Sequence, residues 1–322
     1  MSELNLTSFL TDFAALPDPR LVRRRQYPLL EILLLCVSAS LSGYEEWDEI
    51  VDFGVAKLAW LRRYLPFAAG IPAHDTLNRV MSRLEPRGFE KCLITWVQRC
   101  VKLPEGAHIC LDGKHLRLRR SATARQQQTP HAQGGTSAVH LLHAWCDEAG
   151  LCLCLGQYQT PDKTNEITAL PDLLALLDVQ GCLLTMDAIG CQKNVTQAIA
   201  IAGAEYLLAL KGNQPTLHTA VEAAFATAAD VEAATTTGEK PAHGRVETRT
   251  CRVLPADRLP AALRGPEWVG LQTLVEVVAT RTVSATGVTT TETRHYLSSR
   301  QASAAAFQDY VRRHWSIENR LH

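Results

Sequence analysis

The sequence has no excess of charge of either sign and no paired-cysteine motif. Its 33 Lys and Arg residues balance its 33 Asp and Glu residues, so net charge alone gives no sign of a nucleic-acid partner. Its ten cysteines form no CxxC pair and no Cys/His spacing typical of zinc. Most of them lie in apolar runs, which predicts a reduced protein without disulfides.

Features of exported and membrane proteins are also missing. Glu3 and Asp12 precede any apolar run, which argues against a signal peptide. The apolar stretch 29–41 contains Glu31 and is too short to cross a bilayer, so it is predicted to be a core helix. No internal repeat is visible. We therefore expect a cytoplasmic protein.

The composition is that of an ordinary globular protein, and the N-terminal part of the chain has a helical pattern. Hydrophobic residues make up 46% and charged residues 20% of the 322 residues, enough for a large domain and a smaller one. Residues 1–103 are predicted to form an all-α domain. Apolar residues recur there at helical spacing over about 28–42, 45–64 and 87–101, and after His74. No clear helix-turn-helix pattern is visible.

The pattern changes after Pro104 and predicts a mixed α/β domain over 104–322. Strands are expected at 107–118, 137–147, 151–158, 182–187 and 206–211, with helices at about 165–178 and 193–202 between the later ones. The first three strands fit an antiparallel meander, and the helix-linked strands fit parallel crossovers. This order is that of a ribonuclease H-like sheet.

A β-rich insertion is predicted within this domain, over about 230–300. It follows a helix at about 215–229 and a Thr/Ala-rich stretch at 228–237. Its strand-like runs cover 246–254, 268–283 and 288–298, the last two joined by a hairpin loop at 284–287. The chain ends in a helix that begins near Ser303.

Three acids stand out because of their apolar surroundings. Asp112 lies within an apolar strand, Asp187 ends another, and Glu318 falls in the apolar arc of the last helix. Each alone also fits a structural role: a turn hydrogen bond, a helix cap or an ion pair with arginine. Together they would form an oxygen-rich cage of the kind that Mg²⁺ prefers.

The blocks around these acids have a specific order along the chain. They read Ile109–Lys114, Met186–Gln192 and His314–His322, and further blocks lie at 18–20, 70–76, 163–167, 210–214 and 243–249. In combination these blocks resemble the H-repeat-associated DDE transposases, a family of bacterial insertion-sequence enzymes. The resemblance covers nearly the whole chain in order.

The resemblance implies a DNA transposase with a ribonuclease H-like catalytic domain. It implies that Asp112, Asp187 and Glu318 are the catalytic residues and bind two Mg²⁺ or Mn²⁺ ions. The implied partners are transposon ends and target DNA, bound by a homodimer at the nucleoid, with the helical N-terminal domain assisting in DNA binding. Related enzymes carry a Tyr-Arg-Glu-Lys pattern that Tyr310, Arg313 and Glu318 only approximate.

Basic and polar residues supply candidates for DNA contacts. The candidates are Lys114, Lys211, Asn213, Gln214, His243, Arg245, Arg249, Arg312, Arg313 and Trp315. Two basic clusters, at 20–25 and 113–125, could likewise contact phosphates. Each charged residue also fits an ordinary solvated surface, Trp315 fits core packing as well as base stacking, and His243 fits a β-turn.

Two other functions fit the same sequence. The chain ends four residues after Glu318, where the family typically continues, and a frayed helix end would hold this acid poorly. A truncated or repurposed copy that binds DNA without catalysis is therefore one alternative. A ribonuclease H-fold nuclease is the other. Inverted repeats flanking the reading frame would favour the transposase over both.

Overall fold

The computed structural model describes most of the chain in two compact units, residues 1–102 and 103–322. The described residues are 6–100, 103–116, 138–146, 151–160, 170–171, 174–229, 231–238 and 245–320. Within these ranges only the backbone is described for 6–7, 24, 113–116, 138–143, 151–160, 245 and 316–320.

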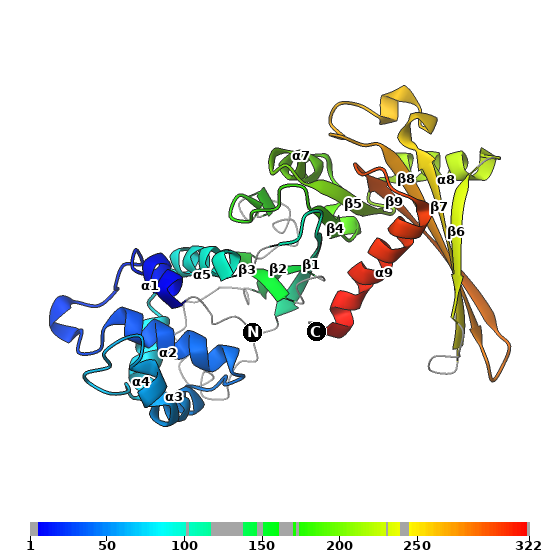
Figure 1. Ribbon diagram of the computed structural model, residues 1–322. Coiled ribbons are helices and arrows are strands. Elements are labelled where there is room, and N and C mark those ends of the chain that lie inside the picture. Colours follow the sequence, from blue (N-terminus) through cyan, green and yellow to red (C-terminus); the bar gives the residue numbers. More distant parts are fainter. Residues whose placement is uncertain are drawn as a thin grey trace, which may run out of the picture. The chain divides into compact units, whose positions relative to one another are not determined.

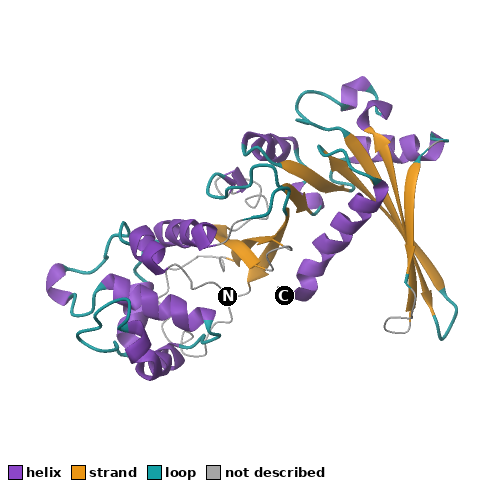
Figure 2. Ribbon diagram, viewed as in Figure 1, coloured by secondary structure: helices purple, strands orange, loops and turns teal. Residues whose placement is uncertain are grey.

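Every regular element of the first unit is a helix (Figure 2). The helices are α1 (Leu6–Phe13), the 3₁₀ turn η1 (Val22–Arg24), α2 (Leu29–Leu41), α3 (Trp47–Leu61), α4 (His74–Met81) and α5 (Pro86–Cys100). Their bounds agree within a few residues with the helices predicted at 28–42, 45–64 and 87–101. Helix α2 is apolar nearly all round, so it lies at the centre of the core.

The acid within α2 has a structural partner. Glu31 is buried, and its Oε1 accepts a hydrogen bond of 2.7 Å from the backbone N–H of Phe67. Phe67 has a positive φ of 45°, a conformation that bulky side chains rarely adopt. This hydrogen bond links the strained loop to α2. It explains why a carboxylate lies inside an otherwise apolar helix.

The second unit is built on one mixed sheet of nine strands (Figure 1). The strands are β1 (His108–Leu116), β2 (Ala138–Cys146), β3 (Leu151–Thr160), β4 (Leu183–Met186), β5 (Glu205–Leu210), β6 (Glu232–Thr237), β7 (Arg245–Pro255), β8 (Thr273–Val283) and β9 (Thr289–Ser298). Their order across the sheet is β3-β2-β1-β4-β5-β9-β8-β7-β6. The fold is therefore mixed α/β, as the strand and helix pattern predicts.

Strand directions follow the predicted change from meander to crossovers. Strands β1, β2 and β3 are antiparallel neighbours, whereas β1–β4 and β4–β5 are parallel pairs. Helix α7 (Lys193–Ile201) connects β4 to β5, as expected for a parallel crossover. Half of the helix predicted at 165–178 lies outside the described residues, and residues 170, 171 and 174 within it are helical.

The insertion extends this sheet. Strand β9 pairs antiparallel with β5, and β8, β7 and β6 follow it outward in an antiparallel meander. The predicted hairpin at 284–287 is present, and Gly287 has the positive φ of 67° that the turn requires. The sequence did not predict that the insertion and the first five strands would share one sheet.

Two strand predictions need correction. The strand expected from 268 begins at Thr273, because Trp268 and Gly270, with a φ of 73°, form a turn before it. The Thr/Ala-rich stretch contains β6, which the sequence analysis left unassigned. This edge strand is almost entirely exposed, so it has no apolar alternation to detect.

Helix α9 (Ala304–Arg320) crosses one face of the sheet and contacts strands from both of its halves (Figure 1). Its first backbone N–H, at Ala304, donates to Glu232 of β6, and Phe307 and Val311 are buried against the strands. An acid at the N-terminus of a helix also complements its dipole. Among the described residues, no helix combines the length and apolar character that a membrane span requires.

Candidate active site

Two of the three candidate catalytic acids lie at equivalent positions on adjacent parallel strands. Leu111 of β1 is the register partner of Met186 of β4, so Asp112 and Asp187 follow at the next position on each chain. Neighbouring strands are about 4.8 Å apart. The fold therefore brings together two carboxylates that are far apart in the sequence.

Asp187 is positioned by the turn that ends β4. Its backbone is extended, with φ −68° and ψ −178°, and it is the N-cap of the 3₁₀ turn η3 (Ala188–Gly190). Its Oδ1 accepts a hydrogen bond of 3.0 Å from the N–H of Ile189. This bond fixes the carboxylate at the carboxyl end of the strand, where ligands gather in α/β sheets.

A chain of buried polar groups joins both strands to α9. His108 Nε2 lies 2.9 Å from Thr185 Oγ1, and the same hydroxyl lies 2.9 Å from His314 Nδ1. Side chains alternate along a strand, so His108 and Asp112 share one face of β1. The extended backbone of Asp187, one residue past β4, continues the alternation and places it on the side of Thr185. Both candidate aspartates therefore belong to the face that α9 covers.

Burial keeps these two histidines uncharged near neutrality. It lowers the pKa of His108 from its ordinary 6.5 to about 3, an effect increased by His314, Arg313 and Arg300. It also lowers the pKa of His314 to about 4, which the negative charge of Asp112 partly offsets. Asp112 is thus close enough to His314 to act on it electrostatically.

Glu318 lies one helical turn beyond His314 in α9. Residues four apart on a helix share a face, so its position is on the side of α9 that His314 presents to β4. The backbone of α9 is described through Arg320, whereas the side chain of Glu318 is outside the described residues.

The segment between β5 and α8 (Pro215–Thr227) supports the turn after Asp187. Asn213 Nδ2 donates to the carbonyl oxygens of Ala188 and Cys191, at 2.6 and 3.4 Å. Gln214 Nε2 donates to the same Cys191 oxygen at 3.2 Å. These amides, predicted as DNA contacts, have backbone partners in the structure, while the neighbouring Lys211 is exposed.

Two further candidates meet on a cavity of about 270 Å³ between α9 and the insertion strands. Arg249, Arg281, Arg294, Glu292 and Trp315 are among the residues that line it. The guanidinium of Arg294 lies over the Trp315 ring, 4.5 Å from its centroid. A base could reach this ring face only by displacing that guanidinium.

Comparison with known families covers both units. The family described as "Transposase DDE domain" matches residues 104–322, and the family described as "DDE_Tnp_1-associated" matches residues 10–97. The chain belongs to the DDE transposase family. The resemblance inferred from the sequence blocks is thereby confirmed.

Individual relatives of this DDE-family chain cover nearly all of it. YncI of Escherichia coli O157:H7, named as a transposase, is 37% identical over 99% of this chain and 79% of its own length. The H repeat-associated protein YhhI of E. coli (strain K12) is 35% identical over 99% and 82%. A piggyBac transposase in a synaptic complex with hairpin DNA matches 94% of this chain and 58% of its own, at 10% identity and a TM-score of 0.35, too low to support any conclusion.

The remaining candidate DNA contacts differ in exposure and in ion pairing. On α9, Arg312 is exposed and Arg313 pairs with Asp309 at 2.6 Å. The side chains of Lys114, His243 and Arg245 lie outside the described residues.

The predicted basic cluster at 20–25 is partly internal to its own loop. The Arg20 guanidinium lies 2.8 Å from the Asp18 carboxylate, and Arg25 lies 3.4 Å from the same group. Although burial opposes it, the hydrogen bonds from Arg20 and both positive charges lower the pKa of Asp18. These two arginines therefore stabilise their own loop, which weakens the case that the cluster binds phosphates.

The acids are conspicuous in the sequence, whereas the buried polar groups that join their strands to α9 are not. His108 and Thr185 are ordinary strand residues in the sequence, and nothing in their spacing connects them. His314 was visible as the residue one turn before Glu318, but its buried hydrogen bond to Thr185 depends on how α9 packs. The supporting role of Asn213 likewise required the tertiary structure.

Proposed function

We propose that this chain is a DNA transposase that cuts at the ends of an insertion sequence and joins them to target DNA. The observation that supports it best is the placement of Asp112 and Asp187 at matching positions of adjacent parallel strands. The helix that contains Glu318 contacts both of these strands. The family membership and this geometry point to the same chemistry.

The proposed fold of the catalytic unit is ribonuclease H-like. Its first five strands lie in the order β3-β2-β1-β4-β5, with an antiparallel meander followed by two parallel pairs. The meander followed by parallel pairs is the arrangement expected from the sequence. The strands β6–β9 then represent an insertion between the second aspartate and the glutamate.

The donor set fits hard divalent cations. Asp112 and Asp187 offer carboxylate oxygens, and Glu318 would add a third carboxylate from α9. His314, which is within electrostatic reach of Asp112, already bonds Thr185, so oxygen donors dominate the site. Mg²⁺ and Mn²⁺ favour such ligands. When bound, a pair of these ions would supply the charge that makes the attacking and leaving oxygens of a phosphodiester reactive.

The protein's own residues hold this arrangement in place. Asp187 is fixed by its hydrogen bond to Ile189, and the following turn is fixed by Asn213. The Thr185–His314 contact fixes the rotation of α9 and therefore the position of Glu318. Such pre-organisation is where a phosphoryl-transfer site gains most of its rate.

DNA would approach along the cationic surroundings of the acids. Lys211 and Arg312 are exposed. Arg249, Arg281 and Arg294 line the cavity beside α9, where they pair with Glu247 or Glu292 and would have to exchange these partners for phosphates. Positive side chains of this kind bind phosphates without reading sequence. Because an element has two ends, we also propose that two copies of the chain act together on DNA.

The proposal is tested with the full chain and a DNA segment that contains the reading frame and its flanks. We expect Mg²⁺-dependent cutting at two fixed positions, followed by joining to a second DNA. Binding without cutting would identify a non-catalytic DNA-binding protein. Cutting of RNA–DNA hybrids or branched DNA without end specificity would identify a nuclease.

A more specific prediction concerns Asn213. Replacing it with alanine removes its bonds to Ala188 and Cys191 and leaves the turn after Asp187 with only the bond from Gln214 to Cys191. We expect about a tenfold to hundredfold loss in the single-turnover cutting rate at saturating DNA. DNA affinity should change little.

Lys211→Ala is the matched comparison in the same segment. Its side chain is exposed, so the substitution should weaken DNA binding and reduce its salt dependence, while the rate at saturation stays near that of the parent. If Asn213→Ala instead lowers only the affinity for DNA, the Asn213 amide contacts DNA and the proposed support of the turn after Asp187 is wrong.

A further inference from the structure

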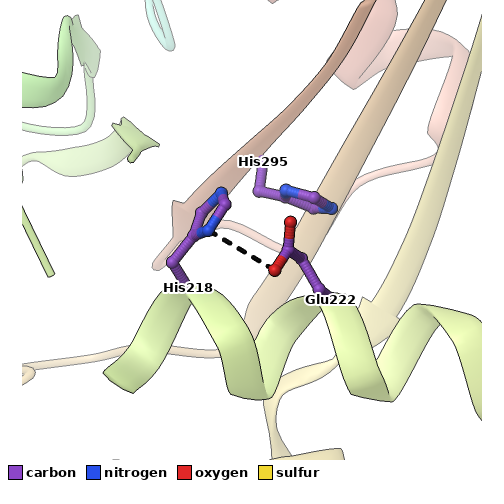
Figure 3. Close-up of side chains that lie close together, drawn as sticks. All are labelled: His218, Glu222 and His295. Carbon is purple, nitrogen blue, oxygen red and sulfur yellow. Dashed lines mark ion pairs between the residues drawn. The ribbon is translucent and has the colours of Figure 1, made fainter. Parts of the chain in front are cut away.

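Three potential metal ligands converge on the face of the sheet opposite α9. His218 and Glu222 come from α8 and His295 comes from β9, and Figure 3 shows their side chains directed toward one another. Their ligand atoms all lie within 4.8 Å of one another. His295 is adjacent in β9 to Tyr296, which packs in the α9-side core, so alternation places His295 on the other face.

The pair on α8 already has nearly the separation that a metal site needs. His218 Nδ1 lies 3.6 Å from Glu222 Oε2, across one helical turn. Two ligands at tetrahedral positions around Zn²⁺, with bonds near 2.1 Å, would be about 3.4 Å apart. The rings of His218 and His295 meet at 79° with centroids 5.1 Å apart, so a small rotation of His218 brings the donors together.

His295 provides an independent indication of a ligand. Its side chain is 3% exposed, and its Nε2 lies 3.2 Å from Glu276 Oε2. Arg252, on the neighbouring strand β7, forms an ion pair with the same carboxylate. The other nitrogen, Nδ1, is buried without a hydrogen-bond partner among the described residues. A buried polar atom left unpaired is costly, so a bound group is expected there.

The contact with Glu276 also resembles the usual support of a metal-binding histidine. Such a histidine donates its second ring N–H to a carboxylate, which fixes the tautomer and makes the free nitrogen a better ligand. In this arrangement the Nε2–H of His295 would donate to Glu276 and the lone pair of Nδ1 would face the ion.

We propose that His218, Glu222 and His295 bind one Zn²⁺ ion. Two imidazoles and one carboxylate suit zinc better than Mg²⁺, which prefers oxygen ligands alone. Glu222 is about half exposed, so water can complete the coordination. The ion would tie α8 to β9 and thereby hold the start of α8 next to Asn213 and Gln214, a structural role separate from cutting.

The test uses the full chain freed of metal with a chelator and titrated with Co²⁺, whose visible absorption reports coordination by nitrogen and oxygen, and then with Zn²⁺ in competition. We expect one ion per chain in this site and a melting temperature that rises by several degrees with excess Zn²⁺. Glu222→Gln and His218→Asn should each weaken binding at least tenfold. Both side chains are partly exposed, so the fold should tolerate these changes.

His74→Ala is the matched control, because His74 is a half-exposed histidine outside this cluster, paired with Asp48 and Asp75. It should leave zinc affinity unchanged, as should Asp187→Asn. Equal affinity in the parent, Glu222→Gln and His218→Asn would overturn the proposal, as would a Co²⁺ spectrum lost in Asp187→Asn. Neither result depends on cutting, so the zinc site and the transposase activity can fail separately.

Discussion

Asp187→Asn is expected to lower the rate of DNA cutting by about a thousandfold or more while leaving the fold intact. The carboxamide loses the negative charge that attracts divalent ions, and losing several kcal/mol of transition-state stabilisation corresponds to a rate loss of that size. Asparagine keeps the Oδ1 acceptor that bonds the N–H of Ile189 at 3.0 Å. It is also a favourable N-cap residue, so the turn after β4 should form as before.

The measurement is single-turnover cutting with Mg²⁺, together with thermal unfolding. Asp257→Asn serves as the control, since Asp257 is an exposed acid in a 3₁₀ turn of the insertion and should tolerate the change in both assays. Asp187→Ala should lose cutting equally and should also lose about 1 kcal/mol of stability with its cap. Cutting by Asp187→Asn within tenfold of the parent would exclude Asp187 from the catalytic set.

The second large effect is a loss of stability in mild acid. The folded pKa values of His108 and His314 are lowered to about 3 and about 4, whereas both would be near 6.5 in the unfolded chain. As the pH falls below 6.5, only the unfolded state takes up these protons. Each histidine therefore lowers the free energy of unfolding by about 1.4 kcal/mol per pH unit. We expect the catalytic unit to lose about 3–5 kcal/mol between pH 6.5 and 4.5.

Chemical denaturation at a series of pH values measures this loss. The window lies above the ordinary pKa values of aspartate and glutamate, so lowered carboxylates such as Glu247 and Glu276 contribute little within it. His314→Gln removes one of the two histidines with a lowered pKa and should reduce the slope by up to half. A stability that stays flat from pH 6.5 to 4.5 would show that the buried histidines do not have the lowered pKa values.

Most elements could be predicted because their signals are local. The helix predicted at 28–42 and the strand at 288–298 correspond to α2 and β9 within a few residues. Apolar periodicity and the positions of proline and glycine depend only on residues that are close in the sequence. They can therefore be recognised without the tertiary structure. The exposed strand β6 has no such signal, and its pairing with β7 alone defines it.

The candidate site was predictable in part for the same reason. An acid in an apolar strand or helix face is conspicuous by itself, which is why Asp112, Asp187 and Glu318 could be chosen as candidates from the sequence. The contact between Thr185 and His314, and the cluster of His218, Glu222 and His295, join residues from distant segments. No spacing rule predicts which of several histidines will meet across a sheet.

The sequence by itself determined the mixed α/β class and the order of most helices and strands, and it singled out three acids as candidates, since each of these signals lies in a short stretch of chain. Only the tertiary structure decided that the insertion continues the same sheet through β5 and β9, that α9 covers β1 and β4, and that buried histidines occupy the space beneath it. The physical reason is that strand pairing and helix packing depend on surfaces assembled from remote segments, and the energies that select among them are not local.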